Sequence, residues 1–146
     1  MNLLIVDDEY LVVEEVVTVT DWELLGITEI YSATNAVSAV RILNEKKIDI
    51  MICDIEMPQT DGLELSKKAK ENFPDLEIVM LTSHAEFNYV RNALRYGCYD
   101  YIHFLRREML DFTAFPVFFV SNLLLVQRKK YYFNRAMVSR NCSIVL

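Results

Sequence analysis

Short apolar runs along the chain are separated by amphipathic stretches. Within most of the runs the apolar residues do not alternate with polar ones, which is typical of strands buried on both faces of a sheet. Between the runs, apolar residues recur every three or four positions, which predicts helices with one buried face. We predict strands over residues 2–6, 28–32, 48–54, 76–81 and 99–104. We predict helices over residues 11–19, 35–46, 63–73 and 86–96.

Strands and helices follow one another in regular succession in this prediction. Such an order is typical of an α/β fold whose parallel sheet is covered by helices on both faces. In the helix predicted over residues 35–46, one face carries four apolar side chains at helical spacing. They are Ala36, Ala39, Val40 and Leu43, which we expect to face the sheet.

The composition is typical of a single folded domain. The chain has 146 residues, of which 53% are hydrophobic, which is enough for one core and argues against disorder. Its net charge of −6 is uneven, because residues 1–90 hold 18 acids and 6 bases whereas residues 91–146 hold 3 acids and 9 bases. The acidic part argues against nucleic-acid binding, and the basic part indicates either an anionic partner or a solvated helix end.

Neither a disulfide framework nor a targeting segment is predicted. Cys53, Cys98 and Cys142 are odd in number and widely spaced, so reduced thiols in a cytoplasmic protein are the simplest interpretation. The N-terminus lacks the basic region of a signal peptide. The apolar segment 112–126 is interrupted by Pro116 and is shorter than the roughly 20 residues of a membrane span, so we expect no membrane association.

Polar side chains follow three of the predicted buried strands. Asp7 and Asp8 come directly after the first strand, Asp54 ends the third, and Thr82 follows the fourth. The carboxyl ends of parallel strands meet at one edge of a sheet, which is where open α/β sheets bind ligands. Alone, each acid is more typical of a helix cap or a turn, but three polar strand ends at one edge favour a binding site.

Clustered carboxylates repel one another unless they share a hard cation such as Mg2+ or one acid stays protonated. A metal ion beside Asp54 would neutralise an incoming phosphate and allow the carboxylate to attack phosphorus. Thr82 would then be placed to donate a hydrogen bond to a phosphoryl oxygen.

Four segments, in this order and spacing, resemble the receiver (CheY-like) domain of two-component response regulators. They are Leu4-Ile5-Val6-Asp7-Asp8-Glu9, Asp54-Ile55-Glu56-Met57-Pro58 with Asp61-Gly62, Leu81-Thr82-Ser83, and Gly97-Cys98-Tyr99-Asp100-Tyr101-Ile102. A further segment, residues 21–26, is similar to receivers attached to AraC-family DNA-binding domains. The resemblance implies a flavodoxin-like, doubly wound (βα)5 fold with five parallel strands in the order 2-1-3-4-5. The receiver would cover residues 1–126, and residues 127–146 would form a C-terminal extension, helical or partly disordered.

The resemblance also implies roles for the acids. Asp54 would accept a phosphoryl group from a histidine kinase. Asp8, Asp54 and the main-chain carbonyl of Glu56 would bind Mg2+ directly, and Asp7 would bind it through water. The domain would be a regulatory phosphoacceptor in transcription control and not an enzyme, apart from self-catalysed phosphotransfer and dephosphorylation.

The switch that the resemblance implies departs from the family at one position. Thr82 would be drawn toward the phosphoryl group, Tyr101 would swing inward with it, and the surface of helix 4, strand 5 and helix 5 would change. The family places a lysine just beyond the fifth strand, where this chain has Phe104. Phenylalanine cannot pair with a phosphoryl charge, although His103 or a nearby arginine could supply a substitute cation. We therefore expect that phosphorylation is retained and that switching is impaired.

The C-terminal part leaves other interpretations open. Segment 112–126 is apolar nearly all round, which suggests a homodimer or an exchanged helix, or else an altered or truncated receiver end. The remaining tail is too short for an AraC-type DNA-binding domain, so we expect no DNA binding by this chain. A phosphate-independent pseudo-receiver, acting in protein interaction or dimerisation, is the main alternative function. An Mg2+-dependent phosphohydrolase with Asp54 as nucleophile is less favoured, because no second domain would hold a substrate.

Overall fold

The computed structural model describes residues 1–18, 20–58, 61–82 and 100–103, and for residues 82 and 100–103 it describes the main chain. The elements in order are β1 (Asn2–Val6), α1 (Tyr10–Thr18), β2 (Glu29–Ala33), α2 (Ala36–Glu45), β3 (Ile50–Asp54), α3 (Gly62–Asn72), β4 (Glu77–Thr82) and β5 (Asp100–His103). Each lies within two residues of a predicted element at both ends. The helix predicted over residues 86–96 and the apolar segment 112–126 lie outside the described residues.

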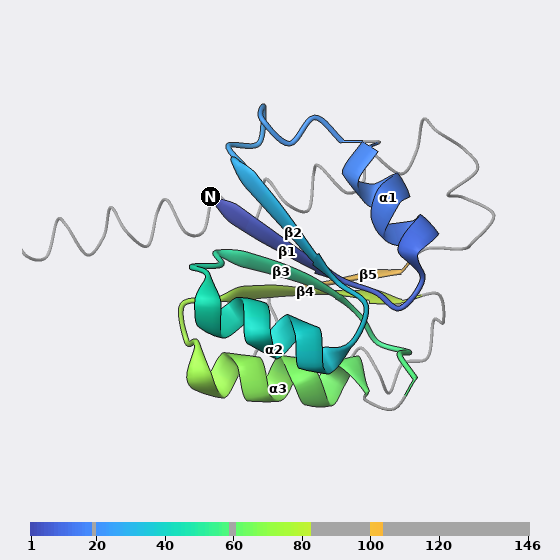
Figure 1. Ribbon diagram of the computed structural model, residues 1–146, viewed down its shortest axis with the longest axis vertical. Coiled ribbons are helices and arrows are strands. Elements are labelled where there is room, and N and C mark those ends of the chain that lie inside the picture. Colours follow the sequence, from blue (N-terminus) through green and yellow to red (C-terminus); the bar gives the residue numbers. More distant parts are fainter. Residues whose placement is uncertain (19, 59–60, 83–99, 104–146) are drawn as a thin grey trace, which may run out of the picture.

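The five strands form one parallel sheet in the order β2-β1-β3-β4-β5, which confirms the predicted fold class and strand order (Figure 1). Val6 pairs with Cys53 across β1 and β3, and Asp54 pairs with Leu81 across β3 and β4. Because the strands are parallel and in this register, the residues that follow β1 and end β3 lie at the same edge of the sheet.

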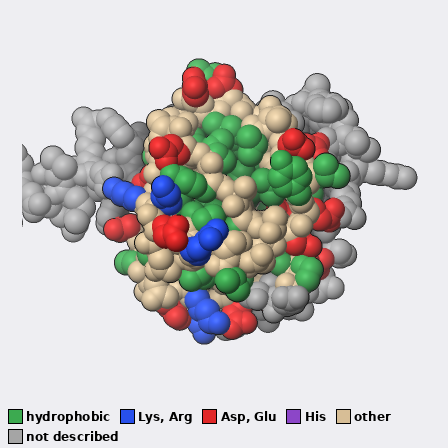
Figure 2. Space-filling model, in the orientation of Figure 1, with side chains coloured by type: hydrophobic (Ala, Val, Ile, Leu, Met, Phe, Trp, Pro, Cys, Tyr) green, Lys and Arg blue, Asp and Glu red, His purple; other side chains and the backbone are tan. Residues whose placement is uncertain are grey.

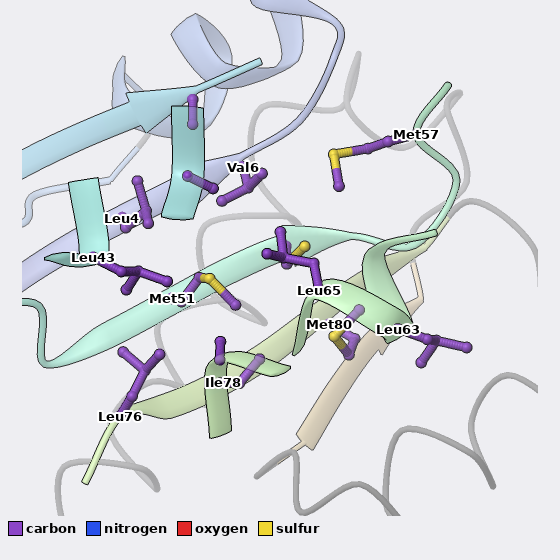
Figure 3. Close-up of a cluster of buried hydrophobic side chains, with 14 of the residues drawn as sticks. Leu4, Val6, Leu43, Met51, Met57, Leu63, Leu65, Leu76, Ile78 and Met80 are labelled. Atoms are coloured by element: carbon purple, nitrogen blue, oxygen red, sulfur yellow. The ribbon is translucent and has the colours of Figure 1, made fainter. Parts of the chain in front are cut away.

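Helices cover both faces of the sheet, with α1 on one face and α2 and α3 on the other (Figure 1). The strand residues alternate between two apolar clusters, which explains why the strands are apolar throughout. The cluster on the α1 side includes Leu3, Ile5, Val13, Val16, Trp22, Ile50 and Ile52. The cluster on the other side includes Leu4, Val6, Leu43, Met51, Cys53, Leu65, Ala69, Ile78 and Met80 (Figure 3).

The start of α2 is fixed by a side-chain cap. Asn35 has extended backbone angles, and its side-chain oxygen accepts a hydrogen bond of 2.9 Å from the Ser38 main-chain N–H. The prediction that Val40 faces the sheet is wrong, because 42% of its surface is exposed whereas Ala39 and Leu43 are buried. The buried stripe of this short helix is narrower than its apolar pattern, and Val40 falls on the flank of that stripe.

The segment between α1 and β2 closes the α1 side of the core. The Trp22 ring is buried, and its Nε1 donates to the Val17 carbonyl oxygen at 2.9 Å. The chain then turns at Gly26, whose φ of 68° is a conformation that favours glycine. This is the segment whose sequence resembles receivers of AraC-type regulators.

The basic side chains of the described part come from α2, α3 and the residues just after α2. In the space-filling view they lie over these two helices and the turn after α2, with acidic side chains beside them and elsewhere on the visible surface (Figure 2). Among the described residues, no helix is both long enough and apolar enough to cross a membrane.

Candidate phosphoacceptor and metal site

Asp7, Asp8 and Asp54 converge at the carboxyl edge of the sheet. One carboxylate oxygen from each lies within 4.8 Å of the corresponding oxygens of the other two. The pairing of Val6 with Cys53 brings the ends of β1 and β3 side by side and so brings these acids together. The prediction that they form one cluster is confirmed.

The alternation of side chains along the strands explains why two of these acids share a face. Ile5 and Ile52 belong to the cluster on the α1 side, so Asp7 and Asp54, each two residues further on, fall on that same face. Asp7 is only 3% exposed, and its Oδ1 accepts a hydrogen bond of 2.8 Å from the Glu9 main-chain N–H. Asp8, in contrast, is exposed to solvent.

Burial raises the pKa of the Asp54 carboxyl from 3.8 to about 6. Hydrogen bonds from the main-chain N–H groups of Glu56 and Ile55 oppose this rise, whereas the negative charges of Asp8 and Glu56 add to it. At neutral pH the carboxylate is still ionised in about nine molecules of ten. A partly buried, ionised carboxylate beside two other acids is therefore available as a ligand or a nucleophile.

Hydrogen bonds anchor the chain directly after Asp54 and directly before α3. The Ile55 N–H donates to the Leu81 carbonyl at 3.0 Å, and the Gly62 N–H donates back to the Ile55 carbonyl at 2.9 Å. Asp61 caps α3 by accepting a hydrogen bond of 2.8 Å from the Leu63 N–H. Ile55, the residue before Glu56, and Asp61, the residue before α3, are thus both anchored.

Two neighbours of Asp54 have contacts that the sequence pattern does not indicate. Gly62 is the first residue of α3, and a Cβ on it would lie 1.9 Å from the Asp54 carbonyl oxygen. The Cys53 Sγ lies 3.3 Å from that same oxygen. Cys53 lies in the strand predicted over residues 48–54, and its side chain is fully buried. The Gly62 contact could not be read from the sequence, because it depends on how α3 docks on β3.

The other predicted site residues are described in part. The main chain of Thr82 pairs with His103, one residue beyond the pair formed by Asp54 and Leu81. The main chain of Tyr101 pairs with Met80. The side chains of Thr82 and Tyr101 and the whole of Phe104 lie outside the description, so their roles stay predictions.

The acidic cluster fits a magnesium ion. Carboxylate oxygens are hard ligands that Mg2+ prefers, and the ion usually keeps several waters. One acid of the cluster is buried, one is partly buried and one is exposed, so the site offers protein oxygens on one side and access to water on the other.

The parallel sheet with an acidic pocket at its carboxyl edge defines a class of regulatory phosphoacceptor domain. A family model for the response regulator receiver domain matches residues 3–104, and the chain belongs to this family. Receiver domains of response regulators are regulatory rather than classical enzymes, receive phosphoryl groups from histidine kinases and bind Mg2+ at an acidic pocket. The predicted family is confirmed.

Known proteins extend this assignment. The chain is 34% identical over 101 residues to the uncharacterized transcriptional regulatory protein YesN of Bacillus subtilis. This alignment covers 69% of this chain and 27% of YesN. It resembles the crystal structure of a two component transcriptional regulator AraC from Clostridium phytofermentans, with a TM-score of 0.69, 20% identity, and coverage of 90% and 98% of the two chains.

A further solved structure is the response regulator protein TrrA from Thermotoga maritima in complex with Mg2+-BeF, with a TM-score of 0.62, 25% identity, and coverage of 73% and 89% of the two chains. The chain spans only part of the curated relatives that it matches: about a quarter of the length of YesN and about half of the length of a second Bacillus subtilis regulator, YhcZ.

Proposed function

We propose that Asp54 of this receiver accepts a phosphoryl group from a histidine kinase in a reaction that depends on Mg2+. The observation that carries the proposal is the convergence of three carboxylates within 4.8 Å at the carboxyl edge of the sheet. An Asp54 oxygen would form a bond to phosphorus while the bond from phosphorus to the kinase histidine breaks. The electron pair of that bond returns to the imidazole nitrogen, which takes up a proton, and Asp54 becomes an acyl phosphate.

The different burial of the three acids supports different modes of metal binding, direct for two of them and through water for the third. Asp8 is exposed and Asp54 is partly buried, so both have oxygens available to a metal ion, together with the main-chain carbonyl of Glu56. Asp7 is buried and one of its oxygens already accepts the Glu9 N–H, which supports its binding through water. When bound, Mg2+ offsets the negative charge that the incoming phosphoryl group adds to the cluster.

Thr82 and Tyr101 would transmit phosphorylation to the surface formed by β5 and the helices on either side of it. The pairing of β4 with β5 supports this role, because it joins the main chains of the two predicted switch segments directly. Phe104, in the place of the family lysine, removes one charge-assisted contact to the phosphoryl group, so the switch would be weaker than is usual. Three further predictions concern residues outside the described part of the chain and remain proposals. They are the domain boundary at residue 126, a homodimer formed through the C-terminal part, and the lack of DNA binding by this chain.

The test is phosphoryl incorporation followed by intact mass. Wild type incubated with Mg2+ and acetyl phosphate should gain one phosphoryl group, and Asp54→Ala should gain none. Asp75→Ala, which removes an exposed acid in the turn before β4, should behave as wild type. Absence of incorporation into wild type, also with a histidine kinase as donor, would favour the phosphate-independent interaction module instead.

A further inference from the structure

We propose that Cys53 and Gly62 are positioning residues that hold the main chain of Asp54 and of the loop carrying Glu56 in the geometry that binds the metal ion. The inference rests on the proposed function of Asp54, and it adds two residues that touch neither the metal nor the phosphoryl group. Both contact one atom, the Asp54 carbonyl oxygen, from the α2 and α3 side of the sheet.

Gly62 permits a close approach between α3 and the end of β3. A Cβ at this position would lie 1.9 Å from the Asp54 carbonyl oxygen, 2.9 Å from the Asp54 carbonyl carbon and 3.0 Å from the Ile55 Cα. All three are main-chain atoms, so a side chain at position 62 could be accommodated only by moving the backbone beside the phosphoacceptor. The Gly62 N–H also closes the loop by donating to the Ile55 carbonyl.

The Cys53 thiol adds a directional contact to this packing. Its Sγ is fully buried and lies 3.3 Å from the Asp54 carbonyl oxygen and 4.0 Å from the Gly62 carbonyl oxygen. The thiol is a weak donor, but it reaches both the last residue of β3 and the first residue of α3. An apolar side chain of similar size would fill the space without this donor.

The two contacts lie where the chain leaves β3 and where it enters α3. Ile55, the first residue after β3, is tied to β4 through the Leu81 carbonyl and to Gly62 through its own carbonyl. The loop carries the Glu56 carbonyl, whereas Asp7 and Asp8 come from a different strand. Loosening the contacts at Asp54 should therefore displace the Glu56 carbonyl relative to the acids and weaken metal binding, even though every carboxylate is retained.

Substitutions at Cys53 separate positioning from packing. Cys53→Ser keeps a donor in a smaller side chain, whereas Cys53→Val fills the cavity but donates nothing. Packing alone predicts that Val is the better substitute, because the site lies in an apolar cluster. We expect the reverse order for Mg2+ affinity, measured on the full chain from amide chemical shifts. Val should raise the Kd about threefold to tenfold and Ser less than about threefold.

Gly62→Ala has a matched control in Gly26→Ala. Gly26 adopts a φ of 68°, and a Cβ there meets nothing within 4 Å, so alanine strains the backbone far from the acids. Gly62→Ala should raise the Mg2+ Kd by about tenfold or more, while Gly26→Ala leaves it within about twofold of wild type at a comparable loss of stability. Equal Kd values for the two variants would overturn the role of Gly62.

Amide hydrogen exchange without metal gives a readout independent of the proposed function. Cys53→Val should accelerate exchange at the Gly62 amide by about fivefold or more relative to the Ala39 amide in α2, and Cys53→Ser should not. If Cys53→Val matches Cys53→Ser in both Mg2+ affinity and exchange, the positioning role is overturned. If wild type binds no Mg2+, the proposed function fails, and the exchange comparison alone decides whether Cys53 and Gly62 hold the loop.

Discussion

Asp54 carries its charge in a setting that disfavours it, because burial and neighbouring acids raise its pKa to about 6. The folded domain therefore binds this proton more tightly than the unfolded chain, where the value is near 3.8. The penalty is present in full above pH 6 and disappears as the pH falls toward 4. A metal ion that offsets the charge would relieve the same penalty.

We expect Asp54→Asn to stabilise the metal-free domain at neutral pH. The pKa shift corresponds to about 3 kcal/mol, which we reduce to about 1–2 kcal/mol because the group is partly exposed to solvent. Urea unfolding in EDTA at about pH 7.5 and about pH 4.5 measures the free energy of unfolding, and the gain should be largest at the higher pH. Asp75→Asn should show no such gain. A variant no more stable than wild type at the higher pH would contradict the assigned burial penalty.

The affinity for Mg2+ should fall as the pH drops through 6. At about pH 5 only about one Asp54 in ten is ionised, and a protonated carboxyl is a poor ligand, so the apparent Kd should rise about tenfold relative to about pH 7.5. Isothermal titration at the two pH values, at equal ionic strength, measures the change. Asp54→Asn serves as the control, since its weaker binding should depend less on pH. A pH-independent Kd in wild type would show that Asp54 is not a ligand.

At the scale of elements, α2 and α3 begin with different kinds of cap. Asn35 caps α2 shortly after β2, whereas Asp61 caps α3 at the end of the segment that carries Glu56. Both caps satisfy main-chain N–H groups at the start of a helix. Only the second also helps to fix the loop beside Asp54.

Asn35→Ala and Asp61→Ala should therefore have similar effects on stability and different effects on metal binding. Each should lower the free energy of unfolding by about 1 kcal/mol. Asp61→Ala should in addition raise the Kd for Mg2+ severalfold, because the first turn of α3 loosens against Asp54. Urea unfolding together with a Mg2+ titration of both variants tests this difference. An unchanged Kd in Asp61→Ala would show that the Gly62 contact is sufficient to hold the loop.

The elements were predictable from the sequence to different degrees. The strands β1 and β3 are apolar because both of their faces are buried, so their pattern identifies them and places Asp7 and Asp54 at their ends. The edge strand β2 has one buried residue among its five, so its apolar pattern is weaker, although the prediction still placed it within one residue. Val40 was misplaced because helical periodicity does not give the width of the buried stripe. The Gly62 contact was not predictable, because it arises where two elements dock.

At the scale of the whole molecule, the sheet order connects the acidic cluster to the predicted output surface. The β3 strand, which ends at Asp54, pairs with β4, and β4 pairs with β5. An effect of phosphorylation at the end of β3 would thus reach β5 through β4, because these three strands are adjacent in the sheet. The strength of the output then depends on how many contacts the phosphoryl group makes with the residues that follow β4 and β5.

Phe104→Lys should increase the conformational response of the receiver. A lysine following β5 would add a charge-assisted contact that exists only when the phosphoryl group is present, and such a contact shifts the equilibrium toward the active state. Amide chemical-shift changes on adding beryllofluoride with Mg2+ should be larger in the variant, while phosphoryl incorporation on Asp54 occurs in both proteins. Phe104→Met controls for loss of the aromatic ring and should leave the response as in wild type. A full response in wild type, equal to that of Phe104→Lys, would show that the receiver switches without the family lysine.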